Sequence, residues 1–125
     1  MGTFLRQRRS VALVVGCLAL GGVAWARTAG HEQGKVVEVS VDGDHYTFTP
    51  ARIEVQKDDL VKITFHAKDI AHSFTVDAYR IAKRAAAGQT VVFEFRADQP
   101  GTYPFYCNLT QDDKCRQMKG EIVVR

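Results

Sequence analysis

The chain has 125 residues, 46% of them hydrophobic, and a formal charge of +3, which suits one folded domain. Its excess positive charge equals the contribution of Arg6, Arg8 and Arg9 near the N-terminus. Without these three, 14 basic residues face 14 acidic ones. No basic stripe interleaved with aromatic residues remains, so the composition argues against a nucleic-acid partner.

The first 26 residues have the pattern of a secretory signal peptide. Residues 11–26 are almost wholly apolar, follow the basic segment, and end in Ala24-Trp25-Ala26, which fits an A-x-A cleavage site. The apolar run of 16 residues is short for a spanning helix, which needs about 20. We therefore expect cleavage and export to the periplasm, with an uncleaved N-terminal membrane anchor as the alternative.

Two other export signals are weaker in this segment. Arg8-Arg9 is compatible with a twin-arginine signal, but paired arginines are common in ordinary signal peptides, so the general secretory route fits better. Residues 14–17, ending in Cys17, resemble a lipoprotein cleavage box. The apolar run before Cys17 is very short, however, and a good A-x-A follows it, which argues against lipidation.

From residue 35 on, the hydrophobic pattern has a period of two, which is typical of strands. Residues 27–34 are small and polar and predict a flexible leader before it. Turn signals at 42–44, 57–59 and 98–101 separate about eight short strands, with 46–49 and 52–55 counted as one strand that Pro50 splits. The predicted strand segments are 35–41, 46–49, 52–55, 60–66, 72–76, 79–83, 90–96, 102–107 and 121–124.

This spacing predicts an all-β fold over residues 35–125, an antiparallel Greek-key sandwich. In segment 60–66 the alternation places Val61, Ile63 and Phe65 toward the core. No stretch has a convincing helical period, except that 111–117 is compatible with one helical turn.

Three sulfur-containing residues gather near the C-terminus: Cys107, Cys115 and Met118. Thiolate, thioether and imidazole groups are the ligands that copper favours, and a histidine from a neighbouring strand would complete such a set. Two cysteines in an exported chain also commonly form a disulfide. The sequence therefore leaves a metal site and a Cys107–Cys115 disulfide open. Apart from His72, the histidines are expected to be solvated: His31, His45 and His66.

Residues 71–76 (AHSFTV) and 101–124 (GTYPFYCNLTQDDKCRQMKGEIVV) resemble the two metal-binding segments of the cupredoxins, the small blue-copper proteins. Upstream segments resemble the same family, so the likeness covers nearly all of 35–125. It implies that His72 is the strand-end ligand, Cys107 the thiolate ligand and Met118 the weak axial ligand.

Cys115 departs from the cupredoxin pattern, because the family has a histidine three residues before the methionine. Met118 lies eleven positions after Cys107, the loop length of the dinuclear copper domain of cytochrome oxidase subunit II and nitrous oxide reductase (C-x3-C-x3-H-x2-M). In that register Gln111 occupies the second cysteine position and Cys115 the histidine position. The resemblance therefore implies a mononuclear set of His72, Cys107, Cys115 and Met118, whose second thiolate would favour Cu(I).

These observations predict an exported cupredoxin that binds one copper ion per chain and carries single electrons. Its expected partner is a periplasmic or respiratory redox protein. A Cu(I) carrier, sensor or storage protein is the first alternative, and a metal-free interaction module closed by the disulfide is the second. We expect no enzyme, since the chain shows no catalytic triad, phosphate-binding glycine loop or paired carboxylates. The mature domain should be a monomer without membrane contact, with a metal-bridged dimer as the alternative.

Overall fold

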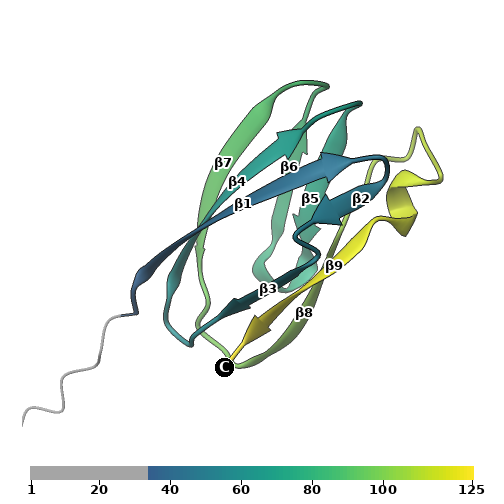
Figure 1. The fold of residues 1–125 in the computed structure, drawn as a ribbon. Coiled ribbons are helices and arrows are strands. Elements are labelled where there is room, and N and C mark those ends of the chain that lie inside the picture. Colours follow the sequence, from purple (N-terminus) through teal and green to yellow (C-terminus); the bar gives the residue numbers. More distant parts are fainter. Residues whose placement is uncertain (1–33) are drawn as a thin grey trace, which may run out of the picture. The chain divides into compact units, whose positions relative to one another are not determined.

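The computed structural model describes residues 34–125, and Figure 1 shows the strands as two packed layers. The predicted signal peptide, most of the predicted leader and His31 lie outside the described residues. The described part contains nine strands and two short 3₁₀ helices. They are β1 (Val36–Asp44), β2 (Thr47–Thr49), β3 (Arg52–Val55), β4 (Leu60–Ala67), β5 (His72–Val76), η1 (Asp77–Tyr79), β6 (Ile81–Ala85), β7 (Thr90–Arg96), β8 (Gly101–Tyr106), η2 (Cys115–Gln117) and β9 (Lys119–Val124).

The predicted β-sandwich is confirmed, but its two sheets are mixed rather than wholly antiparallel. One sheet has the order β2-β1-β4-β7 and the other β3-β9-β8-β5-β6. β1 pairs with β4 in parallel, and so does β3 with β9. The reason is the chain path: after the β1–β2 hairpin the chain crosses to the second sheet for β3. It then returns to place β4 beside β1 in the same direction.

The turn predicted at residues 42–44 is wrong. β1 continues through these residues to Asp44, because its last part pairs with the end of β4. The chain reverses at His45 and Tyr46, which have positive φ angles of 49° and 59°, the left-handed conformation that tight hairpin turns use. The Asp-Gly-Asp composition indicated a turn locally, but pairing with a distant strand extended the ladder instead.

Gly43 lies at a close approach between β1 and the interior. A Cβ atom at this position would lie 3.1 Å from the Phe65 ring and 3.2 Å from the His72 ring. The glycine therefore lets the end of β1 pack directly over His72, at one end of the sandwich.

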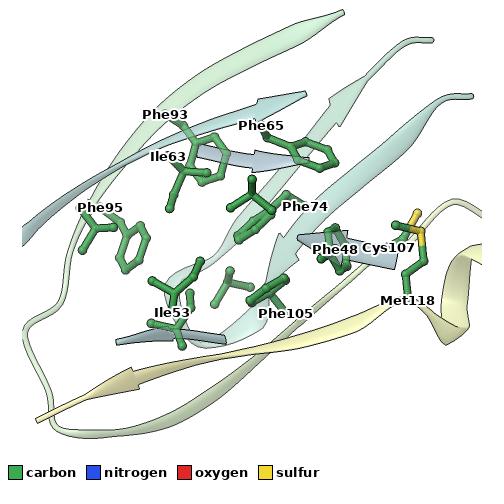
Figure 2. Packing of buried hydrophobic residues seen from close by; sticks show 14 of the residues in the cluster. Phe48, Ile53, Ile63, Phe65, Phe74, Phe93, Phe95, Phe105, Cys107 and Met118 are labelled. Atoms are coloured by element: carbon green, nitrogen blue, oxygen red, sulfur yellow. The ribbon is translucent and has the colours of Figure 1, made fainter. Parts of the chain in front are cut away.

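A cluster of phenylalanines fills the space between the sheets (Figure 2). Phe74 of β5 is its centre, and it stacks on Phe105 of β8 with ring centroids 4.4 Å apart. As predicted, the inward residues of β4 are fully buried: Val61, Ile63 and Phe65. Figure 2 shows Cys107 and Met118 at one end of this cluster, beside Phe48.

The single helical turn predicted within 111–117 is present as η2, which is part of the loop between β8 and β9. Among residues 34–125, no helix has the length and apolar character needed to cross a membrane.

Candidate metal centre

The structure brings the four predicted ligand residues to one end of the sandwich. His72 begins β5, while Cys107, Cys115 and Met118 belong to the loop between β8 and β9. All four are buried, with at most 2% of any one exposed. The backbone N–H of Ser73 donates to Cys107 Sγ at 3.4 Å, and the N–H of Cys107 donates to the carbonyl of Met118 at 3.4 Å. These bonds connect the start of β5 with both ends of the loop.

The imidazole of His72 is held through one nitrogen only. Its Nε2 lies 2.6 Å from Asp69 Oδ1, and because a carboxylate only accepts, the ring proton is on Nε2. Its Nδ1 is buried and has no hydrogen-bond partner among the described residues. A buried polar atom without a partner costs about 1–3 kcal/mol. Histidines that ligate metals commonly donate their other N–H to a carboxylate, so this arrangement fits a metal ligand with Nδ1 as its binding atom.

Asp69 is ionised and accepts the hydrogen bond that orients the His72 ring. Burial raises the pKa of Asp69, but hydrogen bonds from His72 and from the backbone N–H groups of Ile70 and His45 outweigh it. Together they lower its pKa from 3.8 to about 2. The carboxylate therefore stays charged at neutral pH and keeps the proton of His72 on the side away from Nδ1.

Ser73 and Asn108 tie the two ligand-bearing segments together. The Ser73 hydroxyl donates to Asn108 Oδ1 at 2.7 Å and accepts from the backbone N–H of Asn108 at 2.7 Å. Each residue directly follows a predicted ligand, His72 or Cys107. Sequence reasoning missed this pair, and the only signal for it was that adjacency.

Cys107 and Cys115 form a disulfide in the structure, with their Cα atoms 5.2 Å apart. This is one of the two arrangements that the sequence left open. A disulfide and a pair of thiolate ligands are oxidised and reduced states of the same two sulfur atoms. The pairing therefore shows that the sulfurs meet at this site, while the ligand set of the reduced protein stays a prediction.

Tyr46 connects the loop to the β1–β2 turn, a contact that sequence reasoning also missed. Its hydroxyl donates to Asp112 Oδ2; this hydrogen bond is the main cause that raises the pKa of Tyr46 and lowers that of Asp112. Lys114 places its Nζ 5.5 Å from the centre of the Tyr46 ring, a cation–π arrangement. The same ring meets His72 edge-on, with centroids 6.1 Å apart. Tyr46 therefore touches both segments of the site.

Replacing Tyr46 by phenylalanine should loosen this loop. The ring and its contact with His72 remain, but the bond to Asp112 is lost. Amide hydrogens of Cys115, Gln117 and Met118, whose acceptors lie within the loop, should then exchange severalfold faster. Hydrogen exchange followed by mass spectrometry measures this.

The matched control is Tyr106→Phe, which removes another tyrosine–aspartate hydrogen bond, the exposed one from Tyr106 to Asp77 at 3.0 Å. It should leave exchange in residues 108–118 unchanged. Equal exchange in both variants and the wild-type protein would show that the Tyr46 hydroxyl does not hold the loop.

The other predicted histidines in the described part are not brought to this centre. His66 lies on the outward face of β4, where its Nδ1 is 2.7 Å from Thr90 Oγ1. His45 has 86% of its side chain exposed and lies 2.9 Å from Asp44. Together with Asp69 these two residues form a surface group of ligand-type atoms within 4.8 Å of one another. Asp69 is already engaged by His72, so we assign no site there.

Comparison with known proteins decides the family. The family model of the cupredoxin-like domain matches residues 13–124 of this chain. The chain belongs to the cupredoxin-like family. This confirms the family and the fold that the sequence predicted.

Solved structures with low sequence identity share this fold. Auracyanin A, a "blue" copper protein of Chloroflexus aurantiacus, has a TM-score of 0.62 and 17% identity, covering 74% of this chain and 100% of its own. The metal-binding domain of the Cu(I)-exporting ATPase CopA of Streptococcus pneumoniae D39 was solved with Cu(I). It has a TM-score of 0.62 and 19% identity, and the match covers 74% of this chain and 94% of that domain. The periplasmic domain of cytochrome oxidase subunit II (CoxB) of Bradyrhizobium japonicum has a TM-score of 0.63 and 14% identity, and the match covers 71% of this chain and 83% of that domain. No curated protein matches the chain.

Proposed function

We propose that this cupredoxin binds one copper ion in its reduced form and carries single electrons. The proposed ligands are His72 Nδ1 and the sulfurs of Cys107 and Cys115, with Met118 as a weaker fourth. The observation that carries the proposal is the buried Nδ1 atom, which has no partner among residues 34–125. His72 is followed by Ser73, whose N–H donates to Cys107 Sγ. The start of β5 is thereby bonded to the loop that carries three buried sulfur-containing residues. Soft sulfur and imidazole donors are the ligands that copper selects.

The surrounding residues suit a site that changes oxidation state with little movement. Asp69 orients the imidazole, and Ser73 holds both Cys107 and Asn108. Cys107 and Met118 pack beside Phe48 and are buried, so the side of the site that faces the hydrophobic core is closed to water (Figure 2). Copper, when bound, supplies the Cu(I)/Cu(II) couple that accepts and releases one electron. The protein's part is to hold the donors rigidly and to set the potential through this shell.

Among the solved structures that share the fold, auracyanin A is a blue copper protein and the CopA domain contains Cu(I). Both support copper as the metal. The predicted signal peptide supports an exported protein with a periplasmic or respiratory redox partner. We propose an electron carrier rather than an enzyme, because the sequence has no catalytic triad, phosphate-binding glycine loop or paired carboxylates.

A Cu(I) carrier, sensor or storage protein is the second candidate. The observation that favours it is Cys115, a second cysteine whose sulfur meets that of Cys107. Two thiolates are softer and more negative than one, which favours Cu(I) over Cu(II). The two candidates therefore differ in whether a stable Cu(II) form exists.

Anaerobic copper titration of the chemically reduced protein tests the proposal, with Cys115→Ser and Cys115→His run alongside. We expect one equivalent to bind and the oxidised form to show strong thiolate-to-Cu(II) absorption that the serine variant alters. Binding of Cu(I) without any stable Cu(II) form would instead support the second candidate, a Cu(I) carrier, sensor or storage protein. If the reduced protein binds no copper while Cys115→His does, the fold supports a copper site but the native loop does not.

A further inference from the structure

The two cysteines of the Cys107–Cys115 disulfide are both buried, at 0% and 2% exposed, but they differ in their position relative to a surface pocket. Cys115 contributes to a pocket of about 160 Å³, and Cys107 does not. Cys107 is completely buried, and its sulfur faces the backbone N–H of Ser73. The residues that line the pocket with Cys115 are Ile70, Ala71, Leu109, Gln111 and Asp112. A molecule that approaches the disulfide through this pocket meets Cys115 first.

This difference in position favours one direction of thiol–disulfide exchange. An attacking thiolate forms a bond to one sulfur and expels the other as a thiolate, and exchange is faster when the leaving thiolate is stabilised. Attack at Cys115 expels Cys107, whose sulfur already accepts a hydrogen bond from Ser73 at 3.4 Å. Attack at Cys107 would need a route into a fully buried position. Access and leaving-group stabilisation therefore favour the same sulfur.

We propose that the pocket over Cys115 is the entry site for the thiolate of a dithiol protein, which reduces the Cys107–Cys115 disulfide. In the first step the partner's thiolate bonds to Cys115 Sγ, and the Cys107 sulfur leaves as a thiolate. In the second step the partner's other thiolate attacks the partner's sulfur in this mixed disulfide. The partner's own disulfide forms, and Cys115 leaves as a thiolate. Two electrons pass from the partner to this chain, and no other reactant is needed.

The pocket has the chemistry that such a partner needs. Ile70 is 39% exposed and, with Ala71 and Leu109, gives the pocket an apolar wall for the residues around an incoming cysteine. Asp112 is its acidic member, and its carboxylate is already engaged by the hydroxyl of Tyr46 and by the backbone N–H of Lys114. Its repulsion of a thiolate is reduced accordingly.

This inference extends the proposed function without depending on it, because the exchange step involves no metal. In the context of that function, it supplies the pair of free thiols that the proposed copper ligands require. Reduction at Cys115 would then precede metal loading.

The first experiment determines which cysteine is attacked. The oxidised, metal-free protein is treated briefly with glutathione, quenched with acid and N-ethylmaleimide, and mapped by peptide mass spectrometry. We expect glutathione on Cys115 and maleimide on Cys107, with a preference of about tenfold or more for this arrangement. Glutathione on Cys107, or an even distribution, would overturn the proposal, and so would a disulfide that dithiothreitol does not reduce in the folded protein.

The second experiment tests the route through the pocket. Ala71→Leu narrows it, and reduction by dithiothreitol should become severalfold slower. The matched control is Ala78→Leu, in another surface pocket that Tyr79, Asp98, Gln99 and Tyr103 also line. Its reduction rate should equal that of the wild-type protein. Circular dichroism confirms that both variants are folded, and equal rates in folded variants would show that the thiol enters elsewhere.

Failure of this inference is distinguishable from failure of the proposed function. Copper titration uses protein that was reduced chemically beforehand, so it does not depend on how the disulfide is attacked. A protein that binds copper but takes glutathione on Cys107 contradicts the exchange proposal alone. A protein that takes glutathione on Cys115 but binds no copper contradicts the copper proposal alone.

Discussion

Replacing His72 by leucine should remove most copper binding, with only a small loss of stability in the metal-free protein. Loss of one proposed ligand should lower the Cu(I) affinity of the reduced protein by at least about a hundredfold, since even changes around the ligands cost 10–100-fold. The metal-free fold should tolerate the change because His72 Nδ1 has no hydrogen-bond partner in the described part. Asp69 loses its bond to the ring, but it is partly exposed and keeps its bond from the N–H of His45.

Competition with a chromophoric Cu(I) chelator measures the affinity, and urea unfolding of the metal-free protein measures its stability. His66→Leu is the matched control, because His66 lies on the outward face of β4, where its side chain contacts Thr90 and not the candidate ligands. It should leave copper affinity unchanged. An unchanged affinity in His72→Leu would exclude His72 as a ligand. A large loss of metal-free stability would mean instead that the ring is needed for folding.

Replacing Phe74 by alanine should lower the free energy of unfolding by about 3–5 kcal/mol, the usual cost of removing a buried phenylalanine side chain. Phe74 is fully buried and stacks on Phe105 at 4.4 Å. Its centroid is also 5.4–5.9 Å from the rings of Phe48, Phe65 and Phe93. Because Phe105 belongs to one sheet and the other three rings belong to the opposite sheet, little collapse into the cavity is possible.

Urea unfolding of the metal-free protein measures this loss, with Phe74→Leu expected to lose less because it leaves a smaller cavity. Val92→Ala is the surface control, since Val92 is 55% exposed, and it should change stability by less than about 0.5 kcal/mol. A loss below about 1 kcal/mol for Phe74→Ala would contradict a central role for this ring.

The candidate site was predictable as a set of residue types but not as an arrangement of atoms. Cys107, Cys115 and Met118 are close in sequence, and the resemblance of their loop to cupredoxin loops indicated His72 as a fourth member. Nothing in the sequence showed that Asp69 binds Nε2 of that histidine and leaves Nδ1 free. A side chain's orientation depends on the neighbours that folding brings to it.

The contacts that complete the site join distant parts of the chain. Ser73 and Asn108 are 35 residues apart, and Tyr46 and Asp112 are 66 apart. Such pairs leave no local pattern, so sequence reasoning missed both Tyr46 and Ser73. Both residues lay in predicted strands, at 46–49 and 72–76, where nothing in the sequence marked them as part of the site.

By itself the sequence determined the strands and their inward faces, because side chains alternate along a strand and the hydrophobic pattern records that locally. Val61, Ile63 and Phe65 are buried as predicted. Tertiary structure alone decided the parallel pairing of β1 with β4, which carried β1 through the expected turn at 42–44. It also decided the meeting of Cys107 with Cys115 and the pocket over the latter. These features depend on which segments pack together, and the free energy of that packing is a property of the whole sandwich rather than of any short stretch.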